Sequence, residues 1–177
     1  RGERATAIAA QFVVSLTTVR AQIRSILTKL DVNSQLEAVA LLAGRLLSLW
    51  DSPPETRDDP KAAFAALSTD PVLVNGTPMT ARDMVARAAG LHAAFTEHDR
   101  EVLEIVSGPG KLVIAFRHAA RHTGPWSTPV GDLAPTGRRI EALVIDVLTV
   151  DPDGRISAVV VVADELSRLQ QAGAVPA

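Results

Sequence analysis

The sequence predicts an α+β protein in which a helical N-terminal segment precedes a curved antiparallel sheet wrapped on helices. Over the first fifty residues, apolar side chains recur every three or four positions, which is typical of amphipathic helices. Beyond residue 100, long runs of β-branched and aliphatic residues are separated by turns rich in Gly and Pro. Apolar residues make up 47% of the 177 residues and aromatic residues only 3%, so we expect an aliphatic core. Helices followed by consecutive strands indicate an α+β domain.

The N-terminal segment is predicted to form two helices around a tight turn at Val14-Ser15. Ser15 is suited to cap a second helix over residues 16–30, and residues 31–34 break the chain before a third helix. The residues expected to face inward are Ile8, Phe12, Val19, Ile23, Ile26, Leu27 and Leu30. The opposite face of the second helix carries Thr17, Arg20, Ala21 and Arg24. Basic and small polar groups on the second of two helices are typical of a helix-turn-helix recognition helix.

The same segment resembles the LuxR-type DNA-binding domain. The matching residues are Ile8, Ala9, Phe12, Val14, Ser15, Thr18, Val19, Arg20, Ile23, Ile26, Lys29, Leu30, Val32, Ser34, Gln35, Glu37, Ala38 and Val39. The resemblance implies that Arg20 and Arg24 face the major groove with Thr17 and Ala21 beside them, and that Lys29 contacts phosphate. The first helix of this family would precede Gly2, so we expect the chain to be part of a longer protein or a processed form. An ordinary helical hairpin, left over from a DNA-binding domain, is the alternative.

Charge and composition divide the chain into an N-terminal unit (1–50), a linker (51–60) and a second domain (61–177). Residues 1–50 hold six basic and three acidic groups, although the whole chain has a net charge of −2. This local excess fits a phosphate-facing patch on an otherwise acidic protein. Residues 51–60 contain three prolines and no large apolar group, which is typical of a linker. The chain has no cysteine and no metal-ligand spacing, so we expect neither disulfides nor a metal or cofactor.

In the second domain we expect helices before strands. Thr80 and Asp83 form a potential capping box for a helix that ends near residue 96. The other predicted elements are a helix over 61–67, a strand over 72–74, strands over 102–107, 112–121, 139–150 and 155–163, and a final helix over 165–172.

This domain resembles the SnoaL-like polyketide-cyclase family over about residues 60–175. The matching residues are His122, Thr123, Gly124, Pro135, Thr136, Gly137, Arg138, Ile140, Asp153, Gly154, Ile156, Asp164, Leu166, Leu169, Gln170 and Gly173. The resemblance implies a cone in which a curved sheet and helices enclose a pocket. Enzymes of the family use an acidic residue as general acid–base in an aldol ring closure, and Asp164 is the matching position. The fold also hosts binding and dimerisation modules.

Strand alternation gives an expected pocket. Its residues are Ile114, Phe116, His118, His122, Trp126, Val160, Val162 and Asp164. A carboxylate beside an imidazole in an apolar cavity suits proton abstraction next to a carbonyl, so Asp164 and His122 are the catalytic candidates. The alternatives are that the histidines are structural and that Asp164 caps the final helix. Asp146 is interpreted most simply as solvent-facing, with a place in the pocket as the remote alternative.

The predicted function is DNA-binding transcription regulation, with a cone that binds a small apolar ligand or dimerises. Many relatives have a polar E-H-W-type run where this chain has the apolar run 158–162, which leaves no second polar group to stabilise an enolate. A cyclase with a vestigial helical arm and a purely structural dimerisation module are the alternatives. We expect a homodimer, because the third helix is more apolar than a three-helix unit needs. Its apolar residues, which should meet a second copy or the cone, are Leu36, Val39, Leu42, Leu46, Leu47 and Trp50. We expect the protein to be cytoplasmic and without membrane contact, because the sequence has no cysteine and no apolar stretch long enough to span a bilayer.

Overall fold

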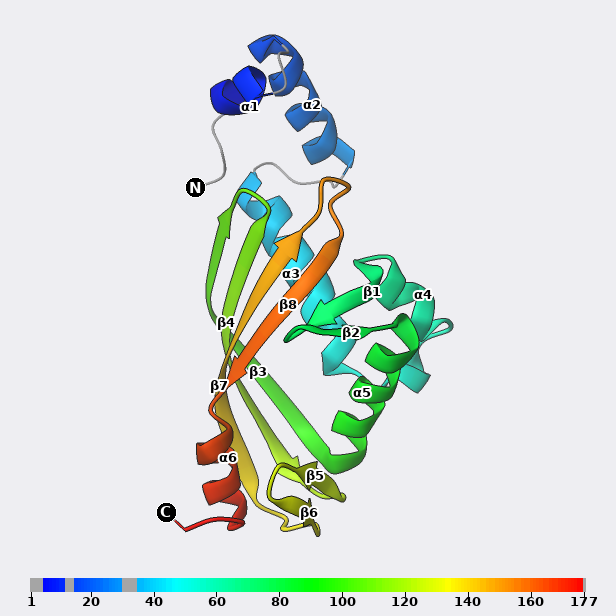
Figure 1. Cartoon of the computed structure of the whole chain (residues 1–177), viewed down its shortest axis with the longest axis vertical. Coiled ribbons are helices and arrows are strands. Elements are labelled where there is room, and N and C mark those ends of the chain that lie inside the picture. Colours follow the sequence, from blue (N-terminus) through cyan, green and yellow to red (C-terminus); the bar gives the residue numbers. More distant parts are fainter. Residues whose placement is uncertain (1–4, 12–14, 30–34, 177) are drawn as a thin grey trace.

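The computed structural model describes residues 5–11, 15–29 and 35–176, and it confirms the α+β class (Figure 1). The helices are α1 (Ala5–Gln11), α2 (Leu16–Lys29), α3 (Gln35–Asp51), the 3-10 helix η1 (Pro54–Thr56), α4 (Pro60–Ala65), α5 (Ala81–Ala94) and α6 (Glu165–Ala172). The strands are β1 (Ser68–Val74), β2 (Thr77–Met79), β3 (Phe95–Gly108), β4 (Lys111–His122), β5 (Trp126–Thr128), β6 (Gly131–Leu133), β7 (Arg139–Val150) and β8 (Ile156–Ala163). None of the helices in these ranges is long and apolar enough to cross a membrane.

Six strands form one sheet in the order β2-β1-β8-β7-β4-β3. The sheet is mixed rather than wholly antiparallel, because β1 pairs in parallel with β8. The long strands β3, β4 and β7 are antiparallel, and two register shifts between β3 and β4 mark bulges of the kind that bend a sheet. The short hairpin β5–β6 forms a second sheet within residues 123–137, where the sequence predicted only a loop.

Asn75 joins β1 to β8 at the end of their parallel pairing. Its backbone N–H donates to the carbonyl oxygen of Val159 at 2.9 Å. Its side-chain oxygen accepts from the backbone N–H of Val161 at 2.8 Å, and its side-chain nitrogen donates to the carbonyl oxygen of the same residue at 3.3 Å. The side-chain amide therefore pairs with β8 much as another strand residue would.

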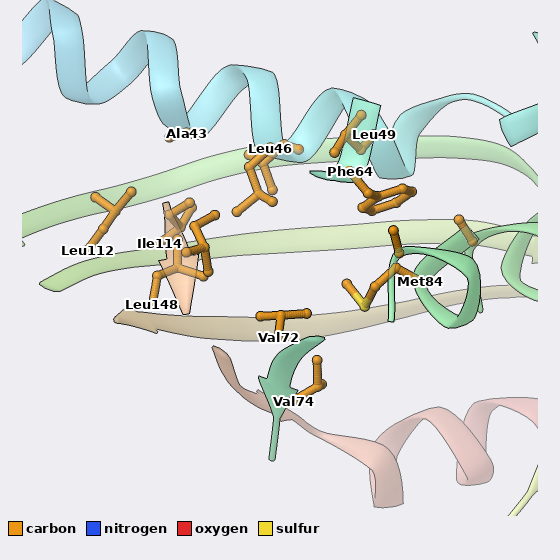
Figure 2. Close-up of a cluster of buried hydrophobic side chains, with 14 of the residues drawn as sticks. Ala43, Leu46, Leu49, Phe64, Val72, Val74, Met84, Leu112, Ile114 and Leu148 are labelled. Atoms are coloured by element: carbon orange, nitrogen blue, oxygen red, sulfur yellow. The ribbon is translucent and has the colours of Figure 1, made fainter. Parts of the chain in front are cut away.

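The main core lies between the sheet and helices α3, α4 and α5. Figure 2 shows Ala43, Leu46 and Leu49 of α3 pointing toward the strands. The buried residues that meet them include Phe64, Val72, Val74, Met84, Leu112, Ile114 and Leu148. The surplus apolar face of α3 is thus used against the cone, one of the two outcomes expected from the sequence. Because α3 bridges the two predicted units, their division at residues 51–60 stays a prediction.

The segment 51–60 is packed rather than extended. Pro54 is buried in η1, and the guanidinium of Arg57 donates to the carbonyl oxygen of Ser48.

The capping box of α5 forms as predicted: the backbone N–H of Thr80 donates to Oδ2 of Asp83 at 2.8 Å, and the backbone N–H of Asp83 donates to Oγ1 of Thr80 at 3.3 Å. This cap fixes the start of a helix that lines the site described below.

Helices α1 and α2 lie apart from the sheet, beyond one end of α3 (Figure 1). Ser15 caps α2 as predicted, because its Oγ accepts from the backbone N–H of Thr18 at 3.0 Å. The side chains of Thr17, Arg20, Ala21 and Arg24 are exposed. The expectations for Phe12, Val14, Leu30 and residues 31–34, and for the side chains of Ile26, Lys29, Gln35, Leu36 and Glu37, lie outside what the structure describes.

Candidate active site

A cavity of about 570 Å³ lies between the concave face of the sheet and helices α3, α5 and α6. Its apolar wall includes Leu46, Leu47, Trp50, Met84, Leu91, Phe95, Phe116, Trp126, Val144, Leu148, Val159 and Val161. The charged or titratable side chains that line it are Arg87, Arg100, His118, Asp146 and Arg168. An apolar cavity of this size with a few polar groups is typical of a site for a small organic molecule.

Asp146 is the acidic group of this cavity. It lies on β7 between Val144 and Leu148, which line the same cavity, whereas Leu143 is exposed on the outer face. Burial raises the pKa of Asp146 to about 6, although the positive charges of Arg100 and Arg87 oppose the shift. Its Oδ1 is buried and has no hydrogen-bond partner among the described residues. The interpretation of Asp146 as solvent-facing is therefore wrong.

Arg100 supplies a buried positive charge from β3. Its side chain is 10% exposed, and its Nη1 donates to the carbonyl oxygen of Leu47 at 3.0 Å and to the carboxylate of Asp51. The guanidinium carbon lies 4.9 Å from the ring centroid of Phe116. Burial lowers the pKa of Arg100, while Asp51 and Asp146 favour its charged form. An arginine in this setting remains a cation at neutral pH.

His118 is the third polar group, and it lies on β4 facing the cavity. Its Nε2 is 3.1 Å from Nδ1 of His98 on β3. Burial, followed by the charge of Arg100, lowers the pKa of His118 to about 4, so its ring is neutral at neutral pH. In the sheet register His118 is opposite Ala142, and Asp146 is four residues further along β7. With a rise of about 3.4 Å per residue, the Cα atoms of His118 and Asp146 are roughly 14 Å apart.

Arg168 of α6 packs against the aromatic end of the cavity. Its Nη1 donates to the carboxylate of Glu165 at 2.9 Å. Its guanidinium carbon is 4.8 Å from the ring of Trp126 and 5.9 Å from that of Phe95. A cation over an indole ring is a favourable contact, and it holds α6 against the β5–β6 hairpin.

The predicted pair of Asp164 and His122 does not meet in this cavity, which corrects the expected catalytic site. Asp164 is exposed, and its Oδ1 accepts from the backbone N–H of Ser167 at 3.0 Å, so it caps α6. His122 is fully buried at the end of β4, where its Nδ1 lies 3.1 Å from Oγ1 of Thr136. Neither residue is part of the cavity lining. Asp164 is therefore a helix cap and His122 a buried structural residue, which are the alternative roles considered from the sequence.

Three other residues of the expected pocket lie elsewhere. Val160 and Val162 are on the outer face of β8, 49% and 55% exposed, while Val159 and Val161 face the cavity. Ile114 is fully buried in the core and does not line the cavity. Because β8 is apolar on both faces, its sequence could not indicate which set of residues points inward.

Phe116, His118 and Trp126 do line the cavity, as expected, and their contact with a ligand stays a prediction. Sequence reasoning ranked Asp146 only as a remote pocket candidate and missed Arg100 as a site residue. A usable signal existed for Asp146, because a lone carboxylate within a long apolar strand is rarely buried without a role. Arg100 lies in the charged run 97–101, where the strand pattern was too weak to assign a face.

Comparison with known proteins shows a SnoaL-like fold. No protein-family model matches the chain, and no curated protein matches it in sequence. TsrD from Streptomyces laurentii is similar in structure, with a TM-score of 0.66 and 16% identity over 81% of this chain and 100% of its own. A protein named as a candidate SnoaL-like polyketide cyclase from Jannaschia Sp. CCS1 has a TM-score of 0.61 and 17% identity over 81% of this chain and 98% of its own. AclR, named as a candidate hydroxylase from Streptomyces galilaeus, has a TM-score of 0.59 and 21% identity over 78% of this chain and 85% of its own.

Proposed function

We propose that this protein is an enzyme that binds a flat, largely apolar carbonyl compound and transfers a proton at the carbon next to the carbonyl group. The observation that supports this most directly is Asp146, a buried carboxyl with an unpartnered Oδ1 and a pKa of about 6 in an apolar cavity. A general base works best when its pKa is close to the working pH. Asp146 meets that condition, whereas an unperturbed aspartate would be a weaker base.

In the proposed reaction, ionised Asp146 accepts a proton from the substrate carbon, and negative charge develops on the carbonyl oxygen. Arg100 provides the positive charge that stabilises this enolate, the group that the apolar valine run of β8 lacked. Protonated Asp146 then returns the proton to carbon or oxygen. Trp126 and Phe116 line the cavity and give it an aromatic wall that suits a planar ring system.

The structural neighbours support a polyketide-like substrate. Several proteins with this fold are named as candidate polyketide cyclases, and an aldol ring closure begins with the same carbon deprotonation. A cyclase was one of the alternative functions considered from the sequence. In the present proposal Asp146 takes the role of general base that was expected for Asp164.

The test is hydrogen exchange into an aromatic ketone. With 1-tetralone in D₂O as the probe, wild-type protein should incorporate deuterium next to the carbonyl, and Asp146→Asn should lower the rate by about 10²–10⁴-fold. Asp164→Asn is the matched control: it makes the same chemical change at an exposed helix cap, where Asn is as good a cap as Asp. Equal rates for wild type and Asp146→Asn, or no exchange by wild type, would overturn the proposal.

DNA binding by the N-terminal helices is the second candidate function. It is supported by the exposed row of Thr17, Arg20, Ala21 and Arg24 on the capped helix α2, at the spacing of one helix face. In that case the cone would be a ligand sensor attached to a DNA-binding segment, and Lys29 would add a phosphate contact. A cytoplasmic homodimer would suit this function, because a two-fold dimer matches a palindromic operator.

A further inference from the structure

The candidate active site adjoins a second cavity of about 440 Å³. Ala93 and Phe95 line both cavities, so the two share a wall. The second cavity is bordered by the exposed residues Asp51 and Glu97 and is therefore open to solvent.

One histidine pair crosses this wall. His118 lines the first cavity and His98 lines the second. The two rings stack with centroids 5.3 Å apart, and Nε2 of His118 lies 3.1 Å from Nδ1 of His98. The pair thus forms a continuous polar contact between the two cavities.

The backbone fixes the direction of this hydrogen bond. Nε2 of His98 lies 3.0 Å from the carbonyl oxygen of Phe95, which can only accept, so Nε2 of His98 bears a proton. Burial lowers the pKa of both histidines, so each ring is neutral and Nδ1 of His98 is an acceptor. Nε2 of His118 is then the donor, and Nδ1 of His118 is left with a free lone pair in a ring that lines the active-site cavity.

We propose that the His118–His98 pair carries protons between the candidate active site and the second cavity. When Nδ1 of His118 accepts a proton from the enol oxygen held by Arg100, which is opposite His118 in the sheet register, its Nε2 proton passes to Nδ1 of His98. The Nε2 proton of His98 then leaves its hydrogen bond to the Phe95 carbonyl oxygen and passes to water in the second cavity, which both residues line. One proton enters and one leaves, and the reverse transfer restores both tautomers.

The need for this path rests on the proposed function. A planar ligand that fills the first cavity would separate the site from bulk water, so protons could not exchange through that cavity during turnover. His98 does not line the first cavity and acts through His118, so it is a positioning residue. His92 gives a matched control: its ring is 4.4 Å from that of His98, but its Nε2 lies 3.1 Å from the carbonyl oxygen of Trp50, outside the path.

The direct test is solvent exchange of the His118 Nε2 proton, followed by NMR without any ligand. His98→Gln keeps a donor for the Phe95 carbonyl but cannot pass a proton through an imidazole, so exchange should slow at least tenfold. His92→Gln should exchange at the wild-type rate. Equal rates in wild type and His98→Gln would overturn the proposal. If His98→Gln does not fold, the nitrogen shifts of wild-type protein decide, because His98 protonated at Nδ1 instead of Nε2 excludes the path.

A second measurement separates this proposal from the proposed function. In the 1-tetralone assay, His98→Ala should slow deuterium uptake about tenfold, and added imidazole should restore part of the rate. If wild type takes up no deuterium but the NMR exchange behaves as expected, the proposed function fails and the proton path stands. If wild type is active and His98→Ala is equally fast, the path is wrong while the proposed function stands.

Discussion

Asp146 should make the stability of the protein depend on pH, and Asp146→Asn should remove that dependence. Burial raises the pKa of Asp146 from 3.8 to about 6, a shift of about two units. Each unit corresponds to about 1.4 kcal/mol, so full ionisation should lower the free energy of unfolding by roughly 3 kcal/mol relative to low pH.

The pH window follows from the sign of this shift. Below the unfolded pKa of 3.8, Asp146 is protonated in both states and its contribution to stability is fully present. Between 3.8 and about 6 the unfolded chain gives up its proton while the folded chain keeps it, so this contribution is lost as the pH rises. Above about 6 the carboxylate is ionised in both states, and the loss is complete.

Urea unfolding of wild type and Asp146→Asn at pH 4, 5, 6 and 8 measures this effect. The free energy of unfolding of Asp146→Asn minus that of wild type should increase by roughly 2–2.5 kcal/mol from pH 4 to pH 8, because only the wild type has a carboxylate to bury and because pH 4 already lies just above the unfolded pKa of 3.8. A difference that stays constant across this range would show that the Asp146 carboxyl is not perturbed. That result would also remove the main argument for Asp146 as a base at neutral pH.

Two other predictions concern the backbone and DNA. Gly124→Ala should lower the free energy of unfolding by about 1–3 kcal/mol or more, because the Cβ of the new alanine would lie 1.9 Å from the carbonyl oxygen of Ala93 at the end of α5. Thermal unfolding measures this effect, and an unchanged melting temperature would contradict the prediction. If α2 binds DNA, Arg20→Ala should weaken binding to a specific site by about 1–3 kcal/mol in a gel-shift assay. Lys29→Ala should instead weaken binding to all DNA sequences and make that binding less dependent on salt. No DNA binding by the wild-type protein would exclude this function.

The sequence predicted the fold class and most elements because their signals were local. The capping box at Thr80 marked the start of α5, and the predicted bounds of β7 and α6 agree with the structure. The hairpin β5–β6 was missed because three-residue strands are too short to show a period of two. Strand β3 was predicted to start too late, because its first half is a charged run that reads equally well as the end of a helix.

The site was harder to predict because its geometry depends on which face of each strand turns inward. Strand β4 was assigned correctly, since His118 and Phe116 share a face with the buried Leu112 and Ile114. Strands β7 and β8 have apolar residues on both faces, so their sequences do not show which residues point inward. The prediction therefore placed Val160 in the pocket instead of Val161, and it placed Asp146 on the solvent side. Hydrophobicity along these strands does not decide between the two arrangements, and their packing against α3 and α5 shows which one is adopted.

The hydrogen bonds of Asn75 bear on which face of β8 points inward. A valine run that is apolar on both faces would tolerate a one-residue slip, because the slip would replace valine by valine on either side of the sheet. The amide of Asn75 binds both the N–H and the carbonyl oxygen of Val161, and a slipped strand would offer it neither group in the same place. The side chain of Asn75 thus selects one register of β8 where hydrophobicity would allow two. Because β7 pairs with β8, Asn75 also helps to position β7, the strand that carries Asp146.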